Sequence, residues 1–214
     1  MSKAPIIVDE AFIEEMEAYR HPCSDSLIES CAASPVVFAE KMLDFRLYAW
    51  QVYFLERIRE RMDREQSIDL NKEFVALTSR QIGKSTAVAI FSLWACIFNK
   101  YPGTIHYNTI VGITSASDVQ AKKLLYEMKK FIYAGDRVMK EKYDKTEFFT
   151  QLLAINEPNN TTTITFNAWQ EGFGLLLNGS KSGSVIKSYP PTSVVLGETF
   201  TVTIIDEAGK TEKI

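Results

Sequence analysis

The segment that most constrains the fold is Thr78 to Ser85, TSRQIGKS, which fits GxxxxGK[ST] except that Thr stands at the first glycine. An apolar segment, FVAL, precedes it, and an apolar segment with helical character, STAVAIFSLWACIF, follows it. A strand, a tight loop and a helix in this order direct backbone N–H groups and the helix dipole at one anion. The segment therefore predicts a phosphate-binding loop. A structural turn that contains Gly-Lys-Ser by chance is the alternative, and the flanking segments disfavour it.

The residues of this loop suggest separate roles toward ATP and Mg²⁺, the two predicted cofactors. Gly83 permits close backbone approach, Lys84 would bridge the terminal phosphates, and the Ser85 hydroxyl would hold Mg²⁺. Arg80 would reach the γ-phosphate as an arginine finger supplied in cis, unless it simply faces solvent. The predicted nucleotide-binding residues of the loop are Ser79, Arg80, Gln81, Ile82, Gly83, Lys84, Ser85 and Thr86.

A second motif, TVTIIDE at residues 201 to 207, is an apolar strand that ends in two adjacent carboxylates. Burying unpaired charge is costly, so such an ending favours a functional role when a phosphate loop lies on the same sheet. Asp206 would reach Mg²⁺ through its water shell, and Glu207 would act as general base toward the attacking water. Taken alone, the motif is more typical of a strand followed by a polar turn.

Upstream of the loop, FRLYAWQ at residues 45 to 51 places an amide beside aromatic side chains. The Gln51 amide offers both a donor and an acceptor, which an adenine edge can pair with. Tyr48 and Trp50 are more typical of core aromatics than of stacking platforms. The position of Gln51, at the head of an amphipathic helix before the loop, favours an adenine contact.

The order of patterns along the chain predicts two parts. Residues 1–72 form an expected N-terminal helical subdomain with a capped helix after Ser34-Pro35, an amphipathic helix from Trp50 to Met62 and a polar linker over 63–72. Residues 73–214 alternate between strand and helix, which predicts a mostly parallel sheet covered by helices. The expected strands are 74–78, 108–114, 161–167, 185–188 and one ending at Asp206, with helices from the loop to Phe98 and from Ser117 to about Ala134.

Charge and composition disfavour two classes of protein: those that bind nucleic acid over their whole surface and those that span a membrane. The formal net charge is −3, which disfavours a surface that binds nucleic acid everywhere, yet residues 122–145 carry eight basic and four acidic side chains. That stretch predicts either a solvated helix face or a DNA-facing one. The longest apolar run, residues 87–98, falls short of the roughly 20 residues that a membrane span needs, so no membrane partner is expected.

The expected location is the cytoplasm, because no secretory signal is readable and the three cysteines are too few for a disulfide framework. His21, Cys23 and Cys31 lack the spacing of a four-ligand metal site, so helix packing is the favoured interpretation of these residues.

Together SRQIGKST, FRLYAWQ and TVTIIDEAG resemble the ATPase domain of the large terminase subunit of tailed bacteriophages, from about Phe45 to Gly209. Members of that family carry a deviant Walker A motif in which an Arg follows Ser, as Arg80 follows Ser79 here. The resemblance implies an α/β P-loop NTPase fold of ASCE type, with the sheet truncated after the Walker B strand. It also implies that Asp206 is the Walker B acid, that Glu207, Arg80 and Lys84 are catalytic, and that Gln51 contacts adenine.

The same resemblance implies a DNA-packaging motor whose partners are double-stranded DNA, a portal protein and a small terminase subunit, with a homo-oligomeric ring on the procapsid. No counterpart of the family's coupling motif or nuclease domain is found in these residues, so a second polypeptide that completes the fold is a further expectation. Two alternatives remain: a superfamily 2 helicase-like ATPase, whose Walker B usually reads DExH or DExD, and a nucleotide-binding or assembly module without turnover.

Overall fold

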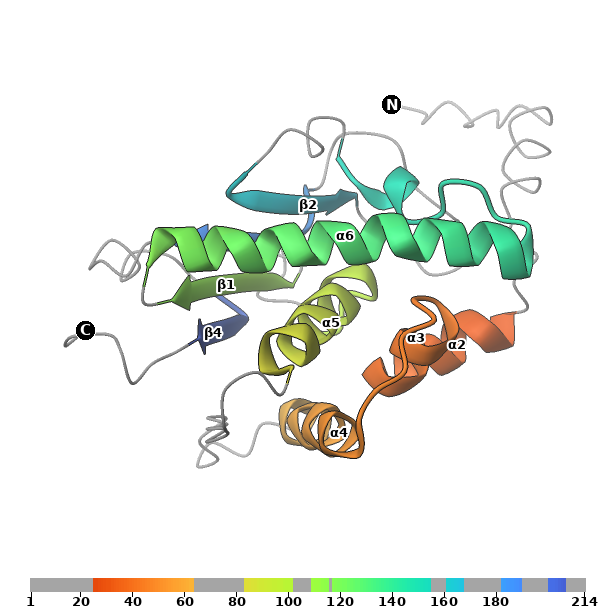
Figure 1. Ribbon diagram of the computed structural model, residues 1–214, viewed down its shortest axis with the longest axis horizontal. Coiled ribbons are helices and arrows are strands. Elements are labelled where there is room, and N and C mark those ends of the chain that lie inside the picture. The colour runs from red at the N-terminus through yellow and green to blue at the C-terminus, as the bar shows by residue number, and fades with distance from the viewer. Residues whose placement is uncertain are drawn as a thin grey trace, which may run out of the picture.

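The computed structural model describes residues 25–63, 83–101, 109–115, 117–154, 161–167, 182–189 and 200–206. It is an α/β structure in which helices and one sheet share a hydrophobic core (Figure 1). Its elements in chain order are α2 (Asp25–Ala33), α3 (Pro35–Lys41), α4 (Ala49–Asp63), α5 (Lys84–Ile97), β1 (Ile110–Ser115), α6 (Asp118–Tyr143), the 3₁₀ turn η1 (Thr150–Leu152), β2 (Thr163–Asn167), β3 (Ser182–Tyr189) and β4 (Val202–Asp206).

The sheet has four described strands in the order β2-β3-β1-β4. Strand β1 pairs in parallel with both β3 and β4, whereas β2 pairs with β3 antiparallel. From Val111 to Ser115 every residue of β1 is buried, as expected for a strand with parallel neighbours on both edges and both faces covered. The expectation of a mostly parallel sheet is therefore confirmed in part, because the described sheet is mixed.

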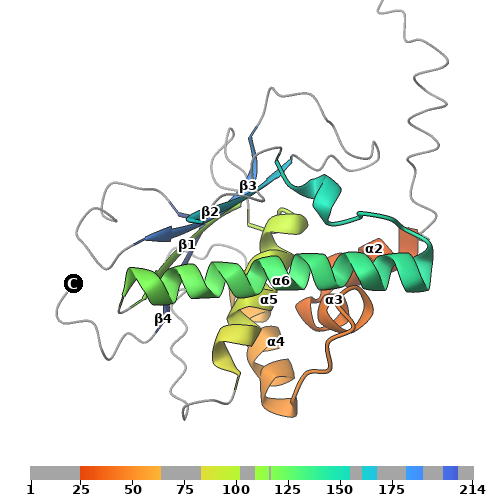
Figure 2. The same ribbon diagram turned by 45° about the horizontal axis from the view of Figure 1, so that its top comes forward.

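Helix α5 is the centre of the core. Its residues from Ala89 to Ile97 are all buried, so this helix is apolar on every side and needs neighbours all round. Figures 1 and 2 show α5 between the sheet and helix α4, with α6 running along the molecule beside it. Because the helix starts at Lys84 and lies at the centre of the core, its position also fixes that of Gly83, the residue before it.

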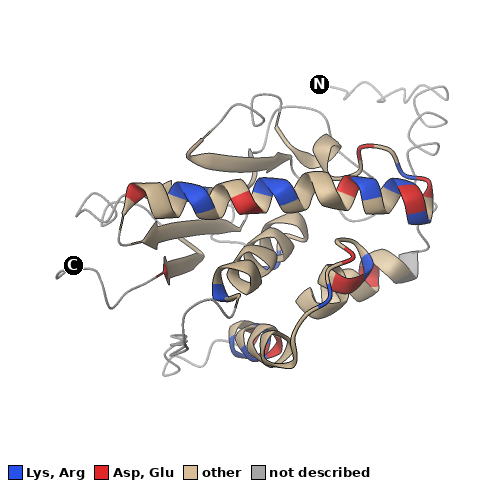
Figure 3. Cartoon of the chain, viewed as in Figure 1, with Lys and Arg blue, Asp and Glu red and all other residues tan. Residues whose placement is uncertain are grey.

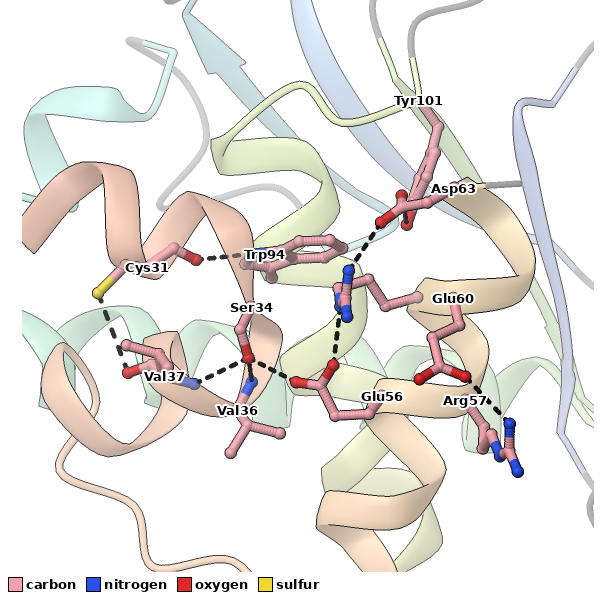
Figure 4. Close-up of polar contacts among 11 residues, drawn as sticks. Cys31, Ser34, Val36, Val37, Glu56, Arg57, Glu60, Asp63, Trp94 and Tyr101 are labelled. Atoms are coloured by element: carbon pink, nitrogen blue, oxygen red, sulfur yellow. Dashed lines mark hydrogen bonds and ion pairs between the residues drawn. The ribbon is translucent and has the colours of Figure 1, made fainter. Parts of the chain in front are cut away.

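Polar contacts hold the N-terminal helices against α5 (Figure 4). The Ser34 hydroxyl caps α3 by accepting hydrogen bonds from Val36 N and Val37 N, and donates over 2.6 Å to Glu56 Oε1 of α4. At the C-terminal end of α4, the Tyr101 hydroxyl donates to Asp63 Oδ1 over 3.2 Å. The predicted Ser34 cap is confirmed, and α4 is attached along its length.

Helix α6 is longer than its sequence predicts. The expected end near Ala134 is wrong, because the helix continues through Gly135 to Tyr143. A Cβ on Gly135 would lie 2.5 Å from Phe149 Cε2 and 3.1 Å from Leu43 Cδ2. The glycine thus serves close packing of a buried phenyl ring against the helix, and it is not a stop signal.

Most other expected elements are confirmed within a few residues. The strand expected over 185–188 extends from Ser182 to Tyr189, and the amphipathic helix expected from Trp50 to Met62 is α4. The expected strand over 74–78, residues 64–72 of the predicted linker and the boundary between residues 72 and 73 lie outside the described residues. The two-part division of the chain stays a prediction.

Candidate nucleotide-binding site

The N-terminus of α5 is built around Gly83, the N-cap residue. Gly83 has φ +84° and ψ 29°, a left-handed conformation that glycine adopts without steric cost. No side chain caps the helix there, and Ala87 N donates to the Gly83 carbonyl over 3.2 Å. Helix N-termini leave backbone N–H groups without partners in the helix, and these groups attract anions. The geometry suits the phosphate-binding role predicted for the loop.

Ser85 lies in the first turn of α5, where its side chain is exposed. Its hydroxyl donates a hydrogen bond over 3.4 Å to Asp206 Oδ2, at the C-terminal end of β4. Asp206 also lies opposite Ser115 in the parallel pairing of β4 with β1. The structure thus brings together the ends of the two motifs that the sequence predicted to share one site.

A hydroxyl and a carboxylate oxygen are ligand types that Mg²⁺ accepts, usually together with waters and phosphate oxygens. Ser85 and Asp206 therefore fit the donor set predicted for that ion. Elsewhere in the described parts of the chain, no three His, Cys, Asp or Glu side chains gather into a metal site.

Gln51 is 1% exposed although it is polar, and both ends of its amide make hydrogen bonds. Tyr48 N donates to Gln51 Oε1 over 2.9 Å, and Gln51 Nε2 donates to the Gly83 carbonyl over 3.0 Å. The head of α4 therefore contacts the start of α5. The contact could not be predicted from a local sequence pattern, because the two residues are 32 positions apart. The adenine contact of Gln51 stays a prediction.

The described residues include only part of the predicted site. Lys84 is the first residue of α5 and Thr86 the third, and both are partly exposed. The remaining predicted residues, Ser79, Arg80, Gln81, Ile82 and Glu207, lie outside the described part, so their roles stay predictions.

The basic stretch of the sequence lies mostly on α6. Figure 3 shows Lys and Arg along the whole helix, with Asp and Glu between them. Lys123, Lys130 and Arg137 are exposed, and they recur every seventh residue, which places them on one face. Tyr126 and Tyr133, 61% and 47% exposed, lie on the same face, and Lys130 Nζ is 4.7 Å from the centre of the Tyr126 ring.

Two lysines of α6, one of them on this face, form exposed ion pairs within the helix, which contribute little to stability. Lys122 pairs with Asp118 at 2.6 Å and Lys130 with Glu127 at 3.0 Å. Ser117 is the N-cap residue of α6, and its hydroxyl accepts a hydrogen bond from Gln120 N.

Comparison with protein families gives a match to the family described as terminase large subunit, T4likevirus-type, N-terminal. The match extends over residues 75–213, well over half of the chain, and it includes the phosphate loop and β4. No curated protein matches the sequence. None of the described helices has the length and apolarity of a membrane span.

Proposed function

Because the chain belongs to the N-terminal family of T4-type terminase large subunits, we propose that it is the ATP-hydrolysing motor domain of a viral DNA-packaging machine. The observation that carries the proposal is the contact of Ser85 with Asp206, which joins the phosphate-loop helix to the carboxylate end of β4. The contact brings a hydroxyl and a carboxylate, two donor types that Mg²⁺ accepts, to one helix N-terminus. The ligand of this site is proposed to be Mg²⁺ with the terminal phosphates of ATP.

In this proposal each residue has one task. Lys84 and the N–H groups at the start of α5 bind phosphate oxygens, while Ser85 and Asp206 hold the metal ion. Bound Mg²⁺ supplies positive charge that neutralises the phosphates. Glu207 accepts a proton from the attacking water, and Arg80 stabilises negative charge that develops on the γ-phosphate.

DNA is the proposed substrate of the motor, with the portal protein, a small terminase subunit and further copies of this chain in a ring as proposed partners. The host cell cytoplasm is the proposed location. For the DNA contact, the exposed face of α6 that carries Lys123, Lys130 and Arg137 is the best candidate among the described surfaces, because duplex binding depends on cations that face phosphates.

The test is ATP turnover by residues 1–214, with and without duplex DNA, beside Lys84→Ala and Glu207→Gln. We expect turnover in the wild-type chain and a loss of at least a hundredfold in either variant, since each removes transition-state stabilisation. A Lys41→Ala variant, which changes an exposed lysine of α3, should retain wild-type turnover and serves as the control.

Three results would redirect the assignment. ATP binding without hydrolysis would favour the assembly module. Strand separation of duplex DNA would favour the helicase alternative, because a packaging motor moves along duplex without unwinding it. Absence of ATP binding would overturn the nucleotide site itself.

A further inference from the structure

We propose that Gln51 is a positioning residue for the phosphate loop, acting through the backbone carbonyl of Gly83. The inference rests on the proposed nucleotide site. It differs from an adenine contact because the Gln51 amide is already held by the protein at both ends, by Tyr48 N at 2.9 Å and by the Gly83 carbonyl at 3.0 Å. An amide has two N–H groups and two acceptor lone pairs, and the remaining donor and acceptor belong to a side chain only 1% exposed.

The hydrogen bond to Gly83 controls the direction of one phosphate-facing group. The Gly83 carbonyl and the Lys84 N–H belong to the same planar trans peptide unit, in which they point in opposite directions. Fixing the carbonyl toward Gln51 and Ala87 N therefore fixes the Lys84 N–H outward from the helix end. That N–H is one of the donors that the loop would offer to an anion.

The packing around Gly83 shows how close this contact is. A Cβ on Gly83 would lie 2.7 Å from Gln51 Nε2, so any other residue would collide with the amide. The positive φ of Gly83 already favours glycine for conformational reasons. Two features therefore favour glycine at position 83: the positive φ and the close contact with the Gln51 amide.

A positioning residue needs a rigid support, and α4 provides one. Phe54 and Leu55, the apolar residues that follow Gln51 on this helix, are 8% and 0% exposed. Ser34 is hydrogen-bonded to Glu56, and Tyr101, which follows α5, to Asp63 (Figure 4). Movement of Gln51 away from Gly83 would therefore disturb several contacts at once.

The experiment measures binding of ATP, GTP and inorganic tripolyphosphate to the full 214-residue chain, at a temperature well below the unfolding midpoint. Gln51→Met removes both hydrogen bonds at similar volume. Gln51→Glu retains the acceptor for Tyr48 N but places a carboxylate against the Gly83 carbonyl. Ser34→Ala is the matched control, because it loosens α4 through Glu56 without changing a group that contacts the loop.

We expect Gln51→Met and Gln51→Glu to lower the affinity for all three ligands by a similar factor of about tenfold. The loop loses the same buried hydrogen bond whether the ligand carries adenine, guanine or no base. Ser34→Ala should lower the melting temperature and leave tripolyphosphate affinity within about twofold of wild type, which separates positioning from general destabilisation.

Three outcomes would overturn the inference while sparing the proposed function. In the first, Gln51→Met weakens the binding of ATP but not of tripolyphosphate, which would make Gln51 a base-reading residue. In the second, Gln51→Met weakens the binding of none of the ligands. In the third, Ser34→Ala weakens their binding as much as Gln51→Met does. Failure of the wild-type chain to bind any of them would overturn the nucleotide site, and the inference with it.

Discussion

The Ser85 hydroxyl donates a hydrogen bond to Asp206 across 121 positions of the chain. The donor lies in the first turn of the central helix, and the acceptor ends a strand whose parallel partner, β1, packs beside that helix. Two exposed or half-exposed polar groups gain little stability from such a bond at 3.4 Å. The contact therefore adds little to the stability of the fold, and its interest is that it joins the start of α5 to the end of β4.

Ser85→Ala should reduce the dependence of ATP binding on Mg²⁺. Removing the hydroxyl deletes one proposed ligand of the ion, so affinity in Mg²⁺ should fall by about tenfold while affinity in EDTA changes little. Titration of ATP with and without Mg²⁺ measures both values. Ser30→Ala, which changes an exposed helical serine bonded to Leu27 O, is the control. An equal loss in Mg²⁺ and in EDTA would contradict a metal role for Ser85.

Gly135→Ala should destabilise the fold although alanine is the better helix former. The gain in helix propensity is about 1 kcal/mol, whereas forcing a methyl group into a packed core costs about 1–3 kcal/mol. Phe149, whose ring atoms would lie 2.5 Å and 2.8 Å from the new Cβ, is fully buried and has little room to move. We expect a net loss of about 1 kcal/mol in a urea titration.

The matched test of this explanation is the same substitution in a Phe149→Leu background. A smaller side chain at position 149 should remove much of the collision, so Gly135→Ala should then be neutral or stabilising. An unchanged penalty in that background would show that the cost comes from elsewhere on the helix.

Neutralising Lys123, Lys130 and Arg137 to Gln should weaken duplex DNA binding and flatten its salt dependence. The three side chains are exposed on one face of α6, and each cation that contacts a phosphate contributes about 0.9 to the slope of log K against log salt concentration. Binding measured at several salt concentrations provides the slope. The control variant carries Gln in place of Lys41, Arg46 and Arg57, which are exposed cations outside α6. It should retain the wild-type slope. Equal slopes in the two variants would make the α6 face an ordinary solvated surface.

Sequence reasoning predicted the parts of the fold that depend on local patterns. The Ser34 cap, the strand ending at Asp206 and the helix beginning after Gly83 each have a signal within a few residues, and each is confirmed. The end of α6 was missed because a glycine inside a helix is usually costly, and only the tertiary contact with Phe149 explains its presence.

Of the two contacts that the described part of the candidate site shows, one could be expected from the sequence motifs and the other could not. The motifs predicted that Ser85 and Asp206 share a site, because the phosphate loop and the strand that ends at Asp206 were expected on the same sheet. The bond between Gln51 and Gly83 joins elements with no common periodicity or motif, so only the packing of α4 against α5 reveals it. The antiparallel direction of β2 against β3 was also not predictable, because the alternation of apolar residues in a strand does not specify its partner or its direction.

Cys96 should make the stability of the chain depend on pH in the alkaline range. Burial raises the pKa of the Cys96 thiol well above its ordinary value of 9.0, because the thiolate loses hydration beside the Thr109 and Val185 carbonyls. A folded pKa above the unfolded one means that this contribution is fully present below about pH 9 and is lost as the pH rises further. At pH 10 the loss should be on the order of 1 kcal/mol.

Urea titrations of the wild-type chain and Cys96→Ala at pH 8 and pH 10 measure this effect, since other titrating groups are common to both proteins. Cys96→Ala should be the less stable protein at pH 8, because it leaves a cavity in the core around α5. Its disadvantage should shrink by about 1 kcal/mol at pH 10, where the unfolded wild-type thiol ionises and the folded thiol does not. A disadvantage that stays constant between the two pH values would mean that the folded thiol ionises as readily as the unfolded one, and so that Cys96 is accessible to water.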